Sequence, residues 1–134
     1  MPEVVAKYLD GESLLEIQTV LDELQGSIVA DFTKYKKNVP SNRLNEVFEA
    51  VVAQSGGKFN LNKASANANH GQIKEALALL EKTGLIYAVT HSAKNGLPLG
   101  AETNDKKKKY LLLDTGIFQR ILGLNIGQFL AAND

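Results

Sequence analysis

The fold is decided by residues 70–116, whose sequence is HGQIKEALALLEKTGLIYAVTHSAKNGLPLGAETNDKKKKYLLLDTG. Apolar residues recur at helical spacing from residue 70 to residue 83, which predicts a helix with one buried face. Asn69 is suited to cap the start of this helix, and Gly84 can adopt the left-handed conformation that ends it. The sequence therefore predicts a helix with defined ends, followed at once by an extended segment.

The second half of this stretch predicts two strands joined by a long polar loop. Leu85–Ser92 alternates between two faces, as expected of a strand, and Tyr110–Leu113 opens a second strand. The loop between them contains the turn residues Asn95-Gly96 and Pro98, and it ends in the lysine run 106–109. A helix followed by such a hairpin is typical of the second half of a winged helix, in which the hairpin forms the wing.

The residues before this stretch predict four further helical segments. Pro2–Leu9 is a short helix, and residues 13–35 form a long amphipathic helix that opens with a capping box of Ser13 and Glu16. Ser41 is expected to cap a helix over 42–54, and residues 60–68 are expected to form a weak short helix. The helices over 42–54 and 60–68, together with the helix over 70–83, form the helical part of the winged helix.

The expected fold class is therefore mainly α (α+β). We expect a winged helix-turn-helix that carries an N-terminal long amphipathic helix and a two-stranded wing hairpin. A final helix is expected to begin near Ile117. The expected domains are a helical linker segment over 1–37 and a winged-helix domain over 38–134.

Composition limits the class of protein. A chain of 134 residues with 44% hydrophobic residues can bury a core, and it has no cysteine for a disulfide or a thiolate zinc site. No apolar run approaches the roughly 20 residues that span a bilayer, and no signal peptide is apparent. We therefore expect a cytoplasmic protein without a membrane partner.

Charge is balanced overall but is uneven along the chain. The net charge of zero argues against a strongly electrostatic nucleic-acid binder. However, residues 1–31 carry seven acidic residues and one lysine, whereas residues 34–109 carry thirteen basic and six acidic residues. This pattern fits either contact between an acidic helix and a basic domain or ordinary solvated surfaces.

The candidate contact residues are lysines on the last helix of the winged helix and on its wing. They are Lys74, Lys82, Lys94, Lys106, Lys107, Lys108 and Lys109. Five engaged wing lysines would give a slope of roughly −4 to −5 of log affinity against log salt. Neighbouring strand lysines point to opposite faces, however, and the alternative role of the run is to protect the hairpin edge from pairing. The helix has no arginine with which to read bases.

No catalytic, cofactor or metal site is expected in this chain. His70 and His91 lack partners at metal-ligand spacing and are expected to be a helix-start and a strand-end residue. No serine lies in a nucleophile motif, and Gly56-Gly57-Lys58 lacks the rest of a phosphate-binding loop. We therefore expect that this chain by itself is not an enzyme.

Five short blocks resemble one known family, and they occur in the order found in that family. They are MPEVV at 1–5, DFTKY at 31–35, ALALLEKTGLI at 76–86, GLPL at 96–99 and KKYLLLDTGIF at 108–118. Together they resemble the middle part of bacterial and archaeal AAA-type ATP-binding proteins, which join a P-loop ATPase domain to a C-terminal nuclease-like region of unknown function. The resemblance implies a longer parent protein, with ATP and magnesium bound only by its ATPase domain.

Three functional hypotheses follow. The first is a non-catalytic interaction module that couples the parent's own ATPase and nuclease-like domains, or a partner. The second is a largely non-specific module that binds duplex DNA through the lysines of the helix and wing. The third is a dimeric transcriptional regulator in which the helix over 14–32 forms the dimer contact.

Overall fold

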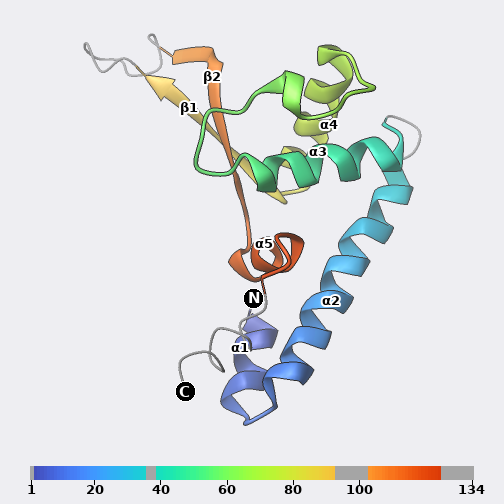
Figure 1. Cartoon of the computed structure of the whole chain (residues 1–134), viewed down its shortest axis with the longest axis vertical. Coiled ribbons are helices and arrows are strands. Elements are labelled where there is room, and N and C mark those ends of the chain that lie inside the picture. The colour runs from blue at the N-terminus through green and yellow to red at the C-terminus, as the bar shows by residue number, and fades with distance from the viewer. Residues whose placement is uncertain (1, 36–38, 93–102, 125–134) are drawn as a thin grey trace. The chain divides into compact units, whose positions relative to one another are not determined.

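The computed structural model describes residues 2–35, 39–92 and 103–124. In this part the chain is mainly helical, with five α-helices, two 3-10 turns and one two-stranded antiparallel sheet (Figure 1). The residues form two compact units. The first unit comprises residues 1–41 and 114–134, and the second comprises residues 42–113.

The first unit begins with two helices joined by a tight turn. They are α1 (Pro2–Leu9) and α2 (Leu14–Asp31), and α2 continues into the 3-10 turn η1 (Phe32–Tyr35). The predicted capping box is confirmed, because the Ser13 hydroxyl accepts from the Glu16 amide and the Glu16 carboxylate accepts from the Ser13 amide at 2.7 Å. These bonds satisfy two amides that the helix itself leaves without a partner.

The last described helix, α5 (Thr115–Ile121), packs on α2 within the same unit. The Asp114 carboxylate caps it by accepting from the amides of Gly116 and Ile117 at 2.8 and 3.1 Å. The Arg120 guanidinium donates to Asp22 of α2 at 2.7 Å. A Cβ at Gly116 would lie 3.0 Å from a methyl group of Leu21, so the close approach of α5 to α2 favours glycine there.

The second unit contains two α-helices, a short 3-10 turn and the sheet. In chain order these are α3 (Ser41–Ala53), η2 (Leu61–Lys63), α4 (His70–Lys82), β1 (Ile86–Ser92) and β2 (Thr103–Leu112). Both α-helices bury one apolar stripe, as their periodicity predicts. The side chains that are at most 2% exposed are Leu44, Val47, Phe48, Val51, Ile73, Ala76, Leu77, Leu80 and Ile86.

The two strands form an antiparallel hairpin. The segment that follows α3 makes one backbone hydrogen bond to this hairpin. Ile86 pairs with Leu112 and Thr90 with Lys108, and the register shifts between Thr90 and His91. The amide of Phe59 donates to the carbonyl of Lys108 at 2.9 Å, on β2. This bond ties the segment between α3 and η2 to the hairpin.

The structure confirms most expected elements of this unit and corrects three. Helix α4, its Asn69 cap and the positive φ of Gly84 (+76°) agree with the prediction. The helix expected over 60–68 is only the 3-10 turn η2, because Asn60 and its neighbours favour local side-chain bonds over a helix. Helix α3 already includes Ser41, which was expected to be its cap.

The third correction concerns the lysine run. The run was expected in a loop before a strand that begins at Tyr110, whereas β2 begins at Thr103 and contains all four lysines. Pairing with β1 extends the strand across residues that have little strand preference of their own. Lys94, Asn95-Gly96 and Pro98 lie outside the described residues.

Candidate anion-binding surface

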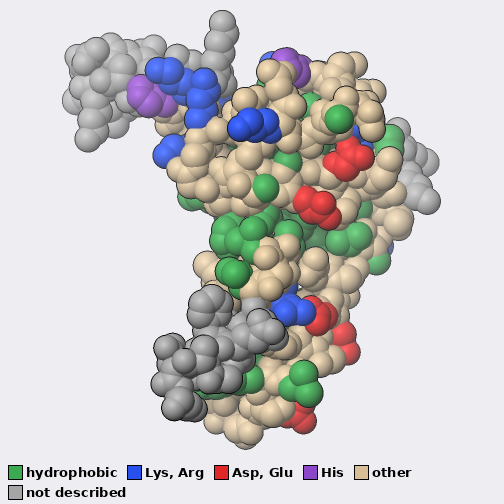
Figure 2. Space-filling view, in the orientation of Figure 1, with side chains coloured by type: hydrophobic (Ala, Val, Ile, Leu, Met, Phe, Trp, Pro, Cys, Tyr) green, Lys and Arg blue, Asp and Glu red, His purple; other side chains and the backbone are tan. Residues whose placement is uncertain are grey.

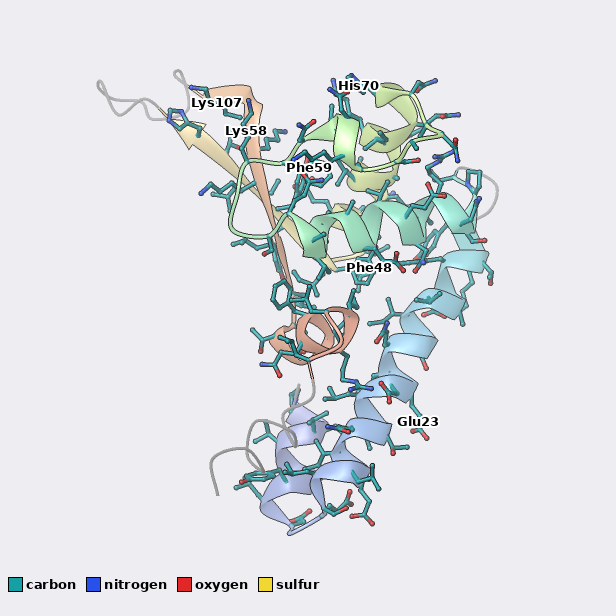
Figure 3. All side chains as sticks on the ribbon, in the orientation of Figure 1. Glu23, Phe48, Lys58, Phe59, His70 and Lys107 are labelled. Atoms are coloured by element: carbon teal, nitrogen blue, oxygen red, sulfur yellow. The ribbon has the colours of Figure 1, made fainter. Side chains whose placement is uncertain are left out.

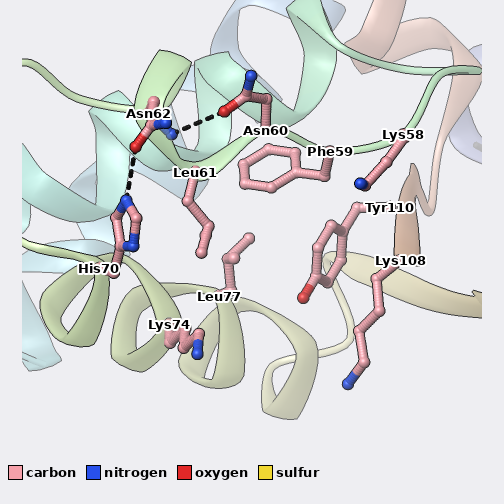
Figure 4. A pocket seen from close by; sticks show the side chains of 10 residues that line it. All are labelled: Lys58, Phe59, Asn60, Leu61, Asn62, His70, Lys74, Leu77, Lys108 and Tyr110. Carbon is pink, nitrogen blue, oxygen red and sulfur yellow. Dashed lines mark hydrogen bonds between the residues drawn. The ribbon is translucent and has the colours of Figure 1, made fainter. Parts of the chain in front are cut away.

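The second unit has a concave pocket of about 430 Å³ beside α4, which we call the basic pocket (Figure 4). Three segments line it: the chain from residue 58 through η2, one face of α4, and β2. Its lining residues are Lys58, Phe59, Asn60, Leu61, Asn62, His70, Lys74, Leu77, Lys108 and Tyr110. The pocket thus joins residues that are widely separated in the sequence.

Three lysines from three different segments meet at the basic pocket. Lys58 precedes η2, Lys74 lies on the second turn of α4 and Lys108 lies on β2 (Figures 3 and 4). No carboxylate is among the lining residues. Within the described part of the chain, neither Lys58 nor Lys74 forms an ion pair. Like charges that converge without carboxylates among them create a site of positive potential that favours an anion.

An aromatic pair forms one wall of the basic pocket. The rings of Phe59 and Tyr110 meet edge to face, with centroids 5.1 Å apart and planes at 82°. Phe59 is buried at 8% exposure, whereas Tyr110 is partly accessible. The edge-to-face contact fixes the orientation of the Tyr110 ring, because such pairs have a preferred geometry. Leu61 and Leu77 add apolar surface to the same cavity.

A chain of hydrogen bonds fixes the polar side chains at the other end of the pocket (Figure 4). The Asn60 side-chain oxygen accepts from the Asn62 amide at 2.9 Å. The Asn62 side-chain oxygen lies 2.6 Å from His70 Nε2. This contact makes Nε2 the donor, so that in a neutral ring Nδ1 is an acceptor. Among the described residues the NH₂ groups of both asparagines make no hydrogen bond, so they can donate to a ligand.

Arg43 holds the segment between η2 and α4 against α3. Its guanidinium donates to the Ser65 hydroxyl at 2.6 Å and to the Asn67 carbonyl at 3.2 Å, and it pairs with Glu46 at 3.2 Å. Ser65 in turn donates to Glu46 at 2.8 Å. The Arg43 side chain is only 14% exposed, and its contacts with Ser65 and Glu46 are partly buried. They fix the chain that leads into the first turn of α4.

A second concavity of about 340 Å³ lies on the hairpin and shares Lys58 and Lys108 with the basic pocket. We call it the hairpin pocket. Its lining residues are Lys58, Val89, Thr90, His91, Lys107, Lys108 and Lys109. In the face that Figure 2 shows, basic side chains of this unit gather toward the hairpin, whereas its acidic side chains lie away from it. The two pockets together form one basic surface.

The structure brings together only part of the predicted lysine set. Lys74 and Lys108 line the basic pocket, and Lys107 and Lys109 line the hairpin pocket, but the exposed Lys82 lines neither. Lys107, Lys108 and Lys109 all line the hairpin pocket, and the Lys109 ammonium donates to the Gly56 carbonyl at 3.1 Å. Lys94 and the side chain of Lys106 lie outside the described residues.

Sequence reasoning did not place Lys58, His70, Phe59 and Tyr110 in a common site, whereas all four line the basic pocket. His70 was expected to be a helix-start residue, which is confirmed, but its ring also bonds Asn62. One signal was present in the sequence. Lys58-Phe59 follows two glycines and places a cation beside an aromatic residue, as Lys109-Tyr110 does on β2.

One family model matches residues 1–127, and its description is Domain of unknown function (DUF8612). The chain belongs to the DUF8612 family. No curated protein and no solved structure matched it. The matched residues include parts of both compact units.

The described residues show neither a cluster of metal-binding side chains nor a membrane-spanning helix. No group of three or more histidine and acidic side chains lies close enough to hold a metal ion in the described part. None of the helices found there combines the length and the apolar character needed to cross a membrane.

Tyr110 should make stability depend on alkaline pH. Burial raises the pKa of its phenol, and the Glu81 carboxylate raises this pKa further. The folded protein therefore holds this proton more tightly than the unfolded chain does. The resulting stabilisation is present below the unfolded pKa of about 10 and is lost as pH rises through the higher folded pKa.

Urea denaturation at a series of pH values checks this expectation. Tyr110→Phe should flatten the fall of the free energy of unfolding above about pH 10, and Glu81→Gln should flatten it partly. Absorbance of the ionised phenol at alkaline pH provides a second readout. An unchanged slope in Tyr110→Phe would contradict the expectation.

Proposed function

We propose that the second unit is a winged-helix module that binds nucleic acid through its phosphate backbone. The order of elements supports the winged helix: α3, the η2 turn and α4 are followed by a two-stranded hairpin. The bond from Phe59 to Lys108 adds a short extended segment to β2, between the first and second helical segments. A helix beside a hairpin is the usual arrangement for placing a helix and a wing against a duplex.

The observation that carries the proposal is the convergence of Lys58, Lys74 and Lys108 on the basic pocket. Lysine is a flexible point charge that suits phosphate, and the chain is electrically neutral overall, so this local concentration is informative. Lys107 extends the charge along the hairpin. A phosphate backbone that follows α4 toward the hairpin would meet all four ammonium groups.

Contacts to phosphate position a protein on nucleic acid but carry no sequence information. The exposed side chains of α4 include Lys74, Glu75 and Lys82, and no arginine lies on this helix. Arginine makes the commonest specific base contact. We therefore propose binding with little sequence preference and without catalysis by this chain.

The coupling role in a longer ATPase rests on the sequence resemblance alone, and so does its implied ATP and magnesium. It is compatible with the present proposal, because a module that binds the DNA backbone can serve a larger enzyme. The role in coupling, like the dimeric regulator, remains a prediction.

Two lysines on the same helix provide a matched test. Lys74 and Lys82 are both exposed on α4, but only Lys74 lines the basic pocket. In fluorescence anisotropy titrations of a labelled duplex at low salt, we expect Lys74→Gln to weaken binding roughly three- to tenfold, in line with the loss of one phosphate contact. Lys82→Gln should bind within about twofold of the unchanged protein.

Two results would count against the proposal. One is the absence of duplex binding at low salt. The other is an equal loss of affinity in both variants, since that would mean net charge rather than the basic pocket determines binding. Circular dichroism of both variants checks that the helices are intact.

A further inference from the structure

We infer that the basic pocket receives one unpaired nucleotide at the end of a nucleic-acid strand, with the base against Tyr110 and the phosphate among the lysines. This inference rests on the proposed function and adds to it a preference for duplexes with unpaired ends. The lining of the basic pocket offers more than a bare phosphate group can use. A phosphate needs only the ammonium groups, whereas six of the ten lining residues carry aromatic rings, aliphatic chains or side-chain amides.

The size of the cavity fits a larger ligand. At about 430 Å³ the basic pocket falls within the range of about 300 to 1,000 Å³ that is usual for small-molecule sites. Phe59 and Leu77 are already buried, so a phosphate backbone that ran across the lysines alone would leave the accessible part of the apolar wall, formed by Leu61 and Tyr110, in contact with water. A planar base that entered between these side chains would cover that wall.

Tyr110 offers the stacking surface. Phe59 is buried and touches the tyrosine ring edge to face, so the partly accessible Tyr110 is the ring that a ligand can reach. Its orientation is set before binding, which reduces the entropy lost when a base stacks on it. Stacking on an aromatic side chain accepts any base, because every base has a π face. Low sequence preference is therefore expected here too.

The polar groups of the pocket suit the edges of a base. Asn60 and Asn62 have their side-chain oxygens engaged, which leaves two NH₂ donors, and His70 Nδ1 is an acceptor. The Tyr110 hydroxyl has no hydrogen-bond partner among the described residues. The Watson–Crick edge of a base presents both donors and acceptors, and it is accessible only where the base is unpaired. The chemistry thus favours a strand end over the interior of a duplex.

The first experiment compares two labelled duplexes of identical paired sequence in fluorescence anisotropy titrations. One is blunt, and the other carries a short single-stranded overhang. We expect the protein to bind the overhang duplex roughly tenfold more tightly, as stacking of one base allows. Tyr110→Leu should abolish this preference, so that this variant binds the overhang and blunt duplexes with equal affinity, while Tyr110→Phe should retain most of the preference.

Tyr87→Leu is the matched control. Tyr87 is 53% exposed on β1, pairs with Leu111 and does not line the basic pocket. The Tyr87→Leu variant should keep the full preference for the overhang duplex. Equal affinity of the unchanged protein for both duplexes would overturn the inference, and so would a preference that survives Tyr110→Leu. Either result could occur while the Lys74 effect on the blunt duplex remains, so failure here differs from failure of the proposed function.

A second experiment needs no substitution at Tyr110. A 5-iodouracil base in the overhang is irradiated in complex with the unchanged protein, and the crosslinked peptide is identified by mass spectrometry. Cleavage after lysine and arginine places Tyr110 in the peptide 110–120 and Tyr87 in the peptide 83–94. A crosslink in 110–120 supports the inference, and a crosslink found only elsewhere overturns it.

A competition titration tests for a small-molecule site. If a free nucleoside monophosphate, at the same concentration as the overhang duplex, fully displaces that duplex from the protein, the pocket is a small-molecule site and the inference is overturned.

Discussion

Replacing Lys58, Lys74, Lys107 and Lys108 together by alanine should remove most of the salt dependence of duplex binding. If each lysine neutralises one phosphate, the slope of log affinity against log salt is about −3.6 for the unchanged protein. This slope corresponds to a loss of affinity of roughly a hundredfold between 50 and 200 mM salt. The variant should show a slope near zero over the same range, with weak binding throughout.

A variant with the same loss of charge is the control. Lys7, Lys34, Lys63 and Lys82 line neither the basic pocket nor the hairpin pocket. Their replacement by alanine changes net charge equally and should leave the slope close to that of the unchanged protein. If the slope decreases equally in both variants, binding depends on overall charge and not on the position of the lysines in the basic surface. Titrations at four or more salt concentrations measure the slope.

Leu80→Ala should lower the free energy of unfolding by about 2–5 kcal/mol. Leu80 lies on the buried face of α4 and is 1% exposed. Its truncation removes apolar contacts and leaves a cavity that close-packed neighbours fill only partly. Urea denaturation followed by circular dichroism measures the change in the midpoint and in the free energy of unfolding.

Leu15→Ala provides the comparison, because it is the same chemical change on a helix surface. Leu15 lies on α2 and is 74% exposed. Its replacement should alter the free energy of unfolding by no more than about 0.5 kcal/mol. A loss of less than about 1 kcal/mol for Leu80→Ala would contradict the burial of this side chain.

The helices could be predicted because their signals are local. The apolar stripes of α2, α3 and α4, the capping box at Ser13 and the left-handed Gly84 all lie within a few residues of the structure that they determine. Burial of one face and satisfaction of the end amides act over a single turn of helix. These features therefore follow from the sequence with little knowledge of the rest of the chain.

The extent of β2 and the composition of the basic pocket could not be predicted, because both depend on distant residues. Lysines at 106–109 have little strand preference, and β2 extends across them because Lys108 and Lys109 on one side and Thr103 and Asn104 on the other pair with β1. The pocket is formed by residues 58–62, α4 and β2, and no local sequence pattern predicts that these three segments lie together. The short η2 turn was overestimated because the local bonds of asparagine compete with helix.

Arg43 reduces the conformational entropy that is lost when a ligand binds. Because its contacts with Ser65 and Asn67 anchor the chain ahead of α4, the conformational entropy of that segment is lost when the protein folds. A ligand at His70 and Lys74 then meets a surface that is already ordered. Arg43 does not line the pocket, yet in this way it contributes to the affinity of a ligand that it never touches. Substitution of Arg43 would weaken binding because the segment ahead of α4 would lose its order, and not because a contact with the ligand is removed.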